Sequence, residues 1–246
     1  MFAKFLKAEK CIIYTDVDGI YTTDPRIVPK AKKIQKISYE EMLEMASLGA
    51  KVMQPHSIQD ARLNRIDIEV KSTFKNLKGS LITKKRNISN KNIIRGVSFT
   101  KNDAKITLIG VKDRPGVAAK IFEPLFRNSI NVDMVVQNIS SSKKETDLTF
   151  TIQSDDLSKT EKLLKKNKKV QFNNIIIDKK VSKVSIVGVG MITTPGVTFR
   201  MFQALAKKKI NIQVISTSEI KISVLINSTK VTKAIEALHK EFDLEK

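Results

Sequence analysis

The sequence predicts an α/β segment followed by two interlocked ferredoxin-like modules of βαββαβ form. Three observations favour this fold class. The stretch 104–117 recurs in similar form at 183–197. A polar loop follows a short apolar strand near the N-terminus, as at the carboxyl ends of strands in open α/β sheets. An additional strand-like run, 93–99, precedes the first repeat, where it can serve the second.

The two repeats keep one register. Gly110, Pro115 and Ile130 of the first repeat each recur 80 positions later (110 to 190, 115 to 195 and 130 to 210), with their Gly-Val and Asn neighbours preserved. Two unrelated loops would rarely keep so many coincidences, so the spacing indicates a duplicated unit.

Each repeat has the same order of elements. An apolar strand runs into a Pro-Gly turn, and apolar residues at i, i+4 and i+5 then predict an amphipathic helix. Two strands and a second amphipathic helix follow, which gives β-α-β-β-α and a four-stranded antiparallel sheet. The predicted strands are 106–111, 130–136 and 146–152 in the first repeat and 184–189, 210–215 and 220–226 in the second; the helix stripes are Val117, Ile121, Phe122, Leu125, Phe126 and Leu163-Leu164, and Val197, Met201, Phe202, Leu205, Ala206, Ile235 and Leu238.

The count of strands predicts that the repeats interlock. The first repeat has a fourth strand at 170–177, but the second has only 242–246 after its last helix, which is too short. The run 93–99 is therefore expected to cross over and complete the second sheet. The first module then lies inside the second.

Length and composition limit the class of protein. A chain of 246 residues with 41% apolar residues can bury a core and form two or three modules. Its apolar runs are strand-sized, far below the roughly 20 residues of a membrane span, and the first ten residues are too polar and short for a secretory signal. The single cysteine, Cys11, fits a reducing compartment. We therefore expect a cytoplasmic protein that does not associate with membranes.

The net charge of +20 does not by itself indicate a nucleic-acid binder. Only 8 of the 45 basic residues are arginine, and the lysines are spread over predicted helix faces and turns. Proteins that bind polyanions concentrate their basic residues and use arginine for bidentate phosphate contacts. We interpret the charge as solvated surface, with weak non-specific attraction to nucleic acid and no specific nucleic-acid partner.

The stretch 15–26 after the predicted buried strand 11–14 has the composition of a ligand loop. It carries three carboxylates, four hydroxyl side chains, a glycine and an arginine. An EF-hand calcium loop is excluded, because Ile20 stands at its fifth position and no Glu at its twelfth. Two interpretations remain. Asp16 and Asp18 can cap turns, or the loop can bind a nucleotide through hydroxyls, backbone N–H groups and Arg26, with an Asp holding magnesium.

The following residues predict two helices, a strand and a linker. Ser38 and Glu41 have capping-box spacing at the start of the first helix, which Gly49 ends. A second helix is expected at 57–64, a strand at 66–72 and a polar, basic linker at 75–92. The predicted division of the chain is 1–76, a linker 77–92, a strand 93–100 that completes the second module, a first module 101–178 and a second module 179–246.

Several common sites are not supported. His56 and His239 lack a second ligand at metal-binding spacing. We find no arrangement typical of Ser-His-Asp or Cys-His catalysis, and the Gly-x-Gly at 188–190 lacks the third glycine of a dinucleotide fingerprint. No catalytic residue and no metal ligand is assigned.

Taken together, the motifs closely resemble those of the aspartokinase family. The resemblance rests on Thr-Asp-Val-Asp-Gly-Ile-Tyr-Thr-Thr-Asp-Pro-Arg at 15–26, Ser-Tyr-Glu-Glu-Met-Leu-Glu-Met-Ala-Ser-Leu-Gly-Ala-Lys at 38–51, and the duplicated Pro-Gly-Val modules ending in Ile-Ser-Thr-Ser-Glu-Ile at 215–220. It implies the end of an amino-acid-kinase α/β sandwich followed by two ACT domains. The family uses ATP, with Mg²⁺, to phosphorylate the side-chain carboxylate of aspartate, the first step toward lysine, threonine and methionine.

The resemblance also implies site residues. The ATP-contacting positions are Thr15, Asp16, Tyr21, Thr22, Thr23, Asp24, Pro25, Arg26 and Lys51. Effector-binding positions in the first module are Asp113, Pro115, Gly116, Val117, Ala118, Ala119, Gln137 and Asn138; those in the second are Thr194, Pro195, Gly196, Val197, Asn211, Ile212, Ser216, Thr217 and Ser218. A Pro-Gly turn that leads into a helix leaves backbone N–H groups free to hold an amino acid's carboxylate, and Asp113 can pair with its ammonium.

The chain departs from the family pattern in one respect. The Lys-Phe-Gly-Gly and Gly-Arg-Gly-Gly-Ser-Asp motifs of the family do not occur in it. We therefore expect roughly the last third of a kinase domain plus the regulatory half, without activity by itself, as a regulatory subunit, a truncated gene product or a partial sequence. The incomplete kinase part is expected to expose apolar surface.

The expected partners follow from the ACT domains. They are lysine or threonine as effector, and a second copy or a full-length aspartokinase chain joined through the ACT domains. The alternative function is a stand-alone ACT amino-acid sensor that regulates another protein.

Overall fold

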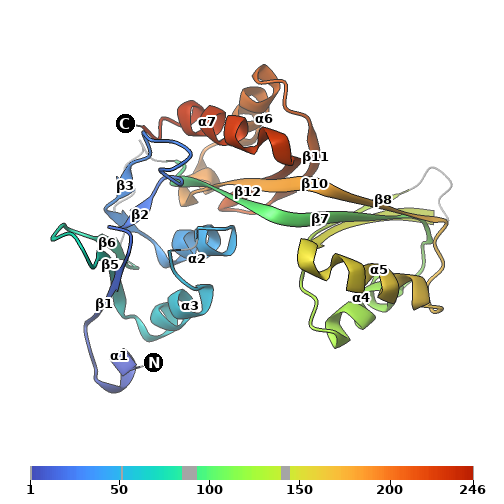
Figure 1. The fold of residues 1–246 in the computed structure, drawn as a ribbon, viewed down its shortest axis with the longest axis horizontal. Coiled ribbons are helices and arrows are strands. Elements are labelled where there is room, and N and C mark those ends of the chain that lie inside the picture. Colours follow the sequence, from blue (N-terminus) through green and yellow to red (C-terminus); the bar gives the residue numbers. More distant parts are fainter. Residues whose placement is uncertain (1, 51, 85–92, 140–144, 246) are drawn as a thin grey trace. The chain divides into compact units, whose positions relative to one another are not determined.

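The computed structural model describes residues 2–50, 52–84, 93–139 and 145–245. The chain divides into two compact units, Met1–Thr100 with Val184–Lys246, and Lys101–Lys183 (Figure 1). The first unit contains the N-terminal part (2–84) and the second repeat; the second unit is the first repeat. This division does not separate the N-terminal part from the second repeat, and the finer domain bounds stay a prediction.

The N-terminal part is built on a small mixed sheet with the strand order β1-β5-β6-β4. Strands β1 and β5 are parallel, β5 and β6 are antiparallel, and β4 and β6 are parallel. A separate antiparallel pair joins β2, which lies within the polar stretch 15–26, to β3. The elements are α1 (Phe2–Phe5), β1 (Lys10–Thr15), β2 (Ile20–Tyr21), β3 (Lys33–Ile34), β4 (Lys36–Ile37), α2 (Tyr39–Ser47), α3 (Pro55–Asn64), β5 (Asp67–Ser72) and β6 (Ser80–Ile82).

Helix α2 begins as the sequence predicts. The Ser38 side chain accepts from the Glu41 N–H, and the Glu41 side chain accepts from the Ser38 N–H, so the capping box is confirmed. Met42 and Met45 are buried in the core of the N-terminal part. Gly49 follows the helix with φ +106°, and a Cβ there would lie 2.1 Å from the Phe99 carbonyl oxygen. Only glycine satisfies both that dihedral angle and that close approach.

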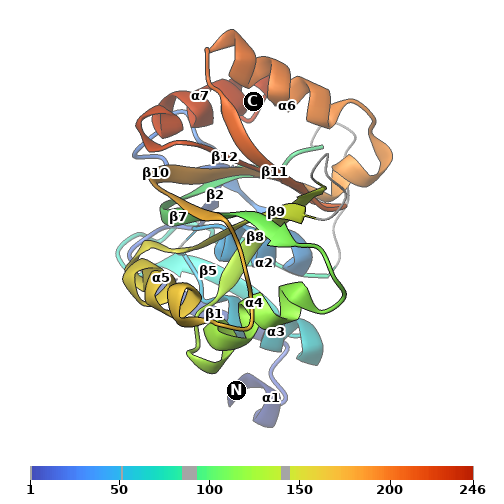
Figure 2. The ribbon, with the colours of Figure 1, turned by 90° about the vertical axis from the view of Figure 1, so that its right-hand side faces the viewer.

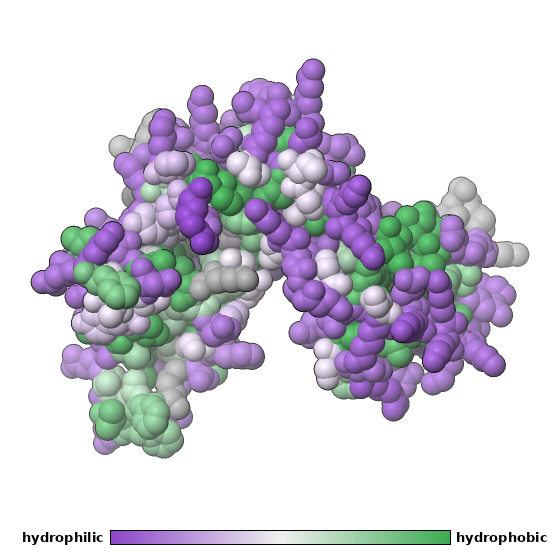
Figure 3. Space-filling model, in the orientation of Figure 1, coloured by the Kyte–Doolittle hydropathy of each residue, from purple (hydrophilic) through white to green (hydrophobic). Residues whose placement is uncertain are grey.

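Two features of the N-terminal part differ from expectation, and a third agrees with it. Strand β1 is not fully buried: Ile12 is 42% and Tyr14 60% exposed, because β1 lies at the edge of its sheet with one neighbour. Helix α1 forms an apolar surface patch (Figure 3), in line with the expected apolar exposure. Residues 80–82 form a strand inside the predicted linker, and 85–92 lie outside the described residues.

The second repeat forms a sheet with the order β11-β12-β10-β7. Strand β7 (Gly96–Lys112) contributes its first residues, 96–100, and β10 (Asn174–Val187) its last, 184–187. The Arg95 N–H donates to the Val187 carbonyl over 2.7 Å, beside this pairing. Figure 2 shows α6 and α7 on one face of the sheet. The remaining elements are η2 (Val189–Thr193), α6 (Val197–Lys207), β11 (Ile212–Thr217), β12 (Lys221–Asn227), η3 (Ser228–Lys230) and α7 (Val231–Glu241).

The first repeat forms the corresponding sheet, β10-β7-β9-β8, from the other halves of the same two long strands. Its own elements are α4 (Val117–Arg127), β8 (Val132–Ile139), β9 (Glu145–Gln153), η1 (Ser154–Asp156) and α5 (Leu157–Lys166). Phe150 lies in its core, edge-on to Phe122 with ring centroids 5.3 Å apart. The predicted crossover of the strand at 93–99 is confirmed, with one refinement: each shared strand runs without a break from one module into the other.

The duplication is visible in the backbone. Gly116 and Gly196 precede α4 and α6 with φ of 83° and 86°, and Ser129 and Lys209 end these helices with φ of 55° and 54°. After each helix, an N–H donates back to a carbonyl of the last turn: the Ile130 N–H to the Leu125 carbonyl, and the Ile210 N–H to the Leu205 carbonyl. These are the bonds of a Schellman motif.

The predicted helix stripes are correct at the i and i+4 positions. Val117, Ile121 and Leu125, and likewise Val197, Met201 and Leu205, are buried. Phe126 is instead 82% exposed and Ala206 is also exposed, because a helix turns about 100° per residue and these positions pass the edge of the buried face. Within the described part of the chain, no helix is long and apolar enough to cross a membrane.

Candidate functional site

The polar loop after β1 is held by bonds among its own side chains. The Thr15 hydroxyl donates to Oδ1 of Asp16 over 3.0 Å. The Tyr21 hydroxyl donates to Oδ1 of Asp18 over 2.8 Å, and Lys33 Nζ lies 3.6 Å from the other carboxylate oxygen. Burial alone would raise the pKa of Asp18, but the Tyr21 hydrogen bond and the Lys33 charge outweigh it and lower that pKa. Asp18 is therefore an ionised anchor of the loop.

Arg26 is the residue of this loop best placed to meet an anion. Its guanidinium pairs with both oxygens of Asp24, with Nη2 2.8 Å from Oδ2. The Arg26 side chain is nevertheless 88% exposed. Exposed ion pairs are weak because solvent screens them, so a phosphate can compete with Asp24 for this fork. Pro25 and Asp16 are also exposed.

The two threonines of the loop point inward. Thr22 is buried, and its Oγ1 lies 2.9 Å from Nε2 of His239 on α7 and accepts from the Lys32 N–H over 3.0 Å. Its carbonyl accepts from the Val97 N–H over 2.7 Å. Thr23 is 4% exposed, and its hydroxyl has no hydrogen-bond partner among the described residues. The loop is thus attached to the second repeat through Thr22.

Eight of the nine residues of the predicted ATP site lie in one continuous stretch, 15–26. Thr15, Asp16, Tyr21, Asp24, Pro25 and Arg26 lie in one continuous loop with Thr22 and Thr23 turned into the protein. Lys51 lies outside the described residues. The nucleotide-contacting roles of these residues stay a prediction. No group of three or more His, Cys, Asp or Glu side chains that could hold a metal ion is found within the described ranges.

A cavity of about 490 Å³ lies at the Pro-Gly turn of the second repeat. Six predicted effector residues line it: Thr194, Pro195, Gly196, Val197, Thr217 and Ser218. Asn211, Ile212 and Ser216 do not line it. Sequence reasoning missed Met191, Ile192, Thr198, Glu219 and Ile222. The sequence could have pointed to these residues only by their position, since each lies within four residues of a predicted effector residue.

The corresponding loop of the first repeat is more open. Asp113, Pro115, Gly116 and Ala119 are exposed, Ala118 is half-buried, and Val117 is buried under the start of α4. Gln137 and Asn138 are exposed on β8. Strand β9 separates them from β7, and its register places Lys112 and Ile139 at the same end of the sheet. Two strand spacings, or about 10 Å, therefore separate the loop from these two side chains.

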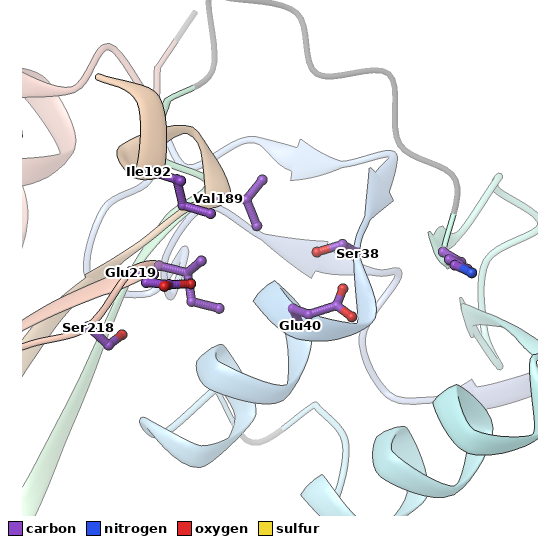
Figure 4. A pocket seen from close by; sticks show the side chains of 8 residues that line it. Ser38, Glu40, Val189, Ile192, Ser218 and Glu219 are labelled. Carbon is purple, nitrogen blue, oxygen red and sulfur yellow. The ribbon is translucent and has the colours of Figure 1, made fainter. Parts of the chain in front are cut away.

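A second cavity, of about 630 Å³, adjoins the first within the same compact unit. Figure 4 shows Ser38, the N-cap of α2, and Glu40 of that helix opposite Val189, Ile192 and Glu219. Three residues line both cavities: Ile192, Ser218 and Glu219. Lys84 and Ile220 complete the lining. Part of the lining of the predicted effector cavity therefore also lines a cavity to which the N-terminal part contributes residues.

Glu41, next to this cavity, is a fully buried carboxylate. Its Oε1 accepts from the Val189 N–H over 3.1 Å. Its Oε2 accepts from the Ser38 hydroxyl over 3.2 Å and from the Ser38 N–H over 3.4 Å, and Arg95 Nε lies 3.9 Å away. The sequence identified Glu41 as a helix cap but gave no sign of its contact with the second repeat.

Comparison with known protein families matches three segments of the chain to two families. Residues 1–72 match the amino acid kinase family. Residues 106–167 and 184–242 match the ACT domain. The polar loop and Glu41 therefore lie in the amino-acid-kinase segment, and both Pro-Gly turns lie in ACT domains.

Curated relatives of the chain are aspartate kinases. The aspartate kinase of Pseudomonas putida is 48% identical over 245 residues, which are 99% of this chain and 59% of that protein. The aspartokinase of Corynebacterium glutamicum is 45% identical over 247 residues and 58% of its length. The chain thus spans about 59% of the length of the curated relatives it matches.

Solved structures extend the likeness to three dimensions. Escherichia coli aspartokinase III, solved with aspartate and ADP, superposes with a TM-score of 0.82 at 27% identity, over 97% of this chain and 53% of that one. The same enzyme with lysine and aspartate gives a TM-score of 0.78. A chain from the structure of aspartokinase alpha and beta subunits is 41% identical, with a TM-score of 0.57 over 61% of this chain and 99% of that one. With its kinase-family segment, its two interlocked ACT domains and these relatives, the chain belongs to the aspartokinase family.

Proposed function

We propose that this chain is the feedback-sensing C-terminal portion of an ATP-dependent aspartate kinase, and that the cavity of its second ACT domain binds lysine or threonine. The enzyme's reaction would be phosphorylation of the aspartate side-chain carboxylate, the first step toward lysine, threonine and methionine. The observation that carries the effector assignment is the cavity of about 490 Å³, which six of the predicted effector residues line.

The cavity has the chemistry that an amino acid needs. Gly196 adopts φ +86° and leads into α6, so the first N–H groups of that helix can bind a carboxylate. Glu219 lines the cavity and can pair with an ammonium group. Thr217 and Ser218 add hydroxyls, and Met191, Ile192 and Ile222 add apolar surface. This combination favours a small zwitterion.

The N-terminal part would contribute to binding of Mg-ATP, which supplies the phosphoryl group when bound. Arg26 and Asp16 are the exposed charged residues of the loop that suit this role. Asp18, tied to Tyr21 and Lys33, keeps the loop in shape. Phosphoryl transfer depends on positioning and charge stabilisation. Because the two family motifs named above do not occur in these residues, we expect no transfer by this polypeptide alone.

The ACT domains are also the proposed route to a partner chain. Strands β8 and β11 stand at the two ends of the strand order, and neither has a second neighbouring strand among the described residues. Unpaired strand edges are ready templates for pairing with another chain. We propose a homodimer, or association with a full-length aspartokinase chain, through these edges.

A stand-alone amino-acid sensor is the second candidate function. The observation that favours it is that every residue lining the cavity of about 490 Å³ belongs to the second ACT domain. It predicts amino-acid binding without a kinase partner.

Thermal unfolding with ligands tests the proposal. Purified chain would be heated alone and with threonine, lysine, both, or Mg-ATP. A ligand at about 100 times its dissociation constant stabilises the folded state by about 2.7 kcal/mol, which is a visible rise in melting temperature. Stabilisation by threonine or lysine supports the effector assignment. Absence of a rise with both amino acids contradicts it.

Two substitutions locate the ligand. Glu219→Gln removes a cavity carboxylate, so the stabilisation by the amino acid should fall. Glu236→Gln changes an exposed carboxylate on α7 that does not line the cavity and serves as the matched control. Equal stabilisation of both variants would place the ligand elsewhere.

A further inference from the structure

Glu41 is a buried charge that the proposed binding sites do not use. Its side chain has no exposed surface. A buried carboxylate is costly unless hydrogen bonds compensate it, and removing one partner leaves the other unsatisfied. The N–H of Val189, the N–H of Ser38 and the Ser38 hydroxyl supply these bonds. Hydrogen bonds therefore tie the carboxylate to two segments at once, and Arg95 Nε lies 3.9 Å from Oε2 as a charged neighbour from a third.

These two segments belong to different domains. Ser38 is the N-cap of α2, in the amino-acid-kinase segment. Val189 is the first residue of η2, in the second ACT domain. Two residues further along η2, Met191 and then Ile192 line the effector cavity. One carboxylate thus bonds both to η2, which carries two residues of that cavity's wall, and to the N-cap of a kinase-segment helix.

We propose that Glu41 is a positioning residue through which a ligand in the cavity of the second ACT domain changes the N-terminal turn of α2. The proposal rests on the proposed function, because it requires that cavity to bind an amino acid. A ligand that contacts Met191 and Ile192 changes the position of η2 and of the Val189 N–H. Because Oε1 accepts a hydrogen bond from this N–H, the carboxylate moves with it. The hydrogen bonds from Ser38 to Oε2 then become longer or shorter.

A second attachment shows that α2 as a whole rests on the ACT domain. Glu44, one turn after Glu41, pairs with Lys221 Nζ over 2.9 Å. Lys221 begins β12, next to Ile222 of the effector cavity. Unlike Glu41, the carboxylate of Glu44 does not cap the helix. It is therefore the matched control for an effect that passes through the cap.

Hydrogen exchange at the first turn of α2 tests the proposal. The reporters are the amides of Glu41 and Met42, which donate to Oγ and O of Ser38. Exchange would be measured in the full chain with and without saturating threonine or lysine. Variants would be Glu41→Gln, whose amide has one acceptor oxygen and cannot serve both Val189 and Ser38, and Glu44→Gln.

The expected result is a difference between these variants. Allosteric coupling free energies correspond to effects of about fivefold or more. In the parent chain and in Glu44→Gln, the amino acid should therefore change the hydrogen-exchange rate of the reporter amides by about fivefold. In Glu41→Gln the amino acid should still bind, but the change should fall below about twofold. A purely structural role of Glu41 would slow or speed exchange equally with and without the ligand.

A second variant acts from the opposite side. Val189→Pro removes the N–H that donates a hydrogen bond to Glu41. Proline is tolerated there because Val189 is the first residue of η2. It should abolish the ligand effect on the reporters without altering the carboxylate, even if Glu41→Gln folds poorly. Binding with an unchanged ligand effect in both variants would overturn the proposal alone. Absence of binding by the parent chain would overturn the proposed function, and the proposal with it.

Discussion

The Pro-Gly turns of the two ACT domains have the same backbone conformation, but the strands that precede them are anchored by different residues. In the first, the N–H of Gly110 at the end of the strand donates to Oδ1 of Asp147 over 3.0 Å, within the same module. In the second, the N–H of Val189, one register position earlier in the repeat, donates to Glu41 of the kinase-family segment. The duplication has kept the turn and changed the anchor. The second copy is therefore attached to the kinase-family segment at a position where the first copy is anchored within its own module.

Loss of the Glu41 carboxylate should show the largest effect. Glu41→Ala removes half of the capping box and leaves the Val189 N–H without its acceptor, which together should cost about 3 kcal/mol of unfolding free energy. Asp147→Ala removes the corresponding anchor of the first copy, which is half-buried, at a cost of about 1 kcal/mol. Urea unfolding of both variants measures the two costs. Equal costs would show that the anchors are equivalent.

The shared turn should respond equally in both copies. Gly116→Ala and Gly196→Ala put a Cβ into open space, so only the left-handed backbone resists, by about 1–2 kcal/mol each. Urea unfolding of the two variants should give the same loss. A loss at one glycine twice that at the other would contradict the view that the turn itself is unchanged.

The ion pair of α2 with β12 should matter less. Lys221→Met leaves Glu44 without its partner, and the two side chains are 27% and 26% exposed. A partly screened pair of this kind contributes about 0.5–1 kcal/mol. Lys165→Met, which breaks an exposed pair with Glu161 in the first copy, is the control. Thermal unfolding should show a smaller change for the control than for Lys221→Met.

His239 should give the second copy a weak pH dependence. Burial lowers the pKa of His239 from its ordinary value of 6.5, and Glu245 only partly opposes this. The unfolded chain therefore binds the His239 proton more tightly than the folded chain does. The contribution of neutral His239 to the free energy of unfolding is complete above pH 6.5 and is lost as the pH falls through the lowered pKa of the folded state. His239→Gln should flatten the change in melting temperature between about pH 7.5 and about pH 5.5. An unchanged slope would show that other groups cause it.

The architecture of the ACT domains was predictable because repetition gives every element two independent observations. The crossover of the strand at 93–99 followed from counting strands, and the capping box from the spacing of Ser38 and Glu41. Short strands such as β6 were missed, since three residues carry no periodicity. The inward turn of Thr22 and Thr23 was missed because hydroxyl side chains suit a buried bond as well as a phosphate. The contact of Glu41 with Val189 joins residues 148 apart in sequence, which local patterns do not reveal.

One titration tests the difference between the two copies most directly. The ¹⁵N-labelled chain would be titrated with threonine and with lysine while the amide signals of Gly116, Gly196, Val189 and Glu41 are followed. We predict that the amide signals of Gly196, Val189 and Glu41 shift together with one dissociation constant. Any shift of the Gly116 signal should follow a different dissociation constant. Saturation of Gly196 with unchanged signals from Val189 and Glu41 would contradict the account.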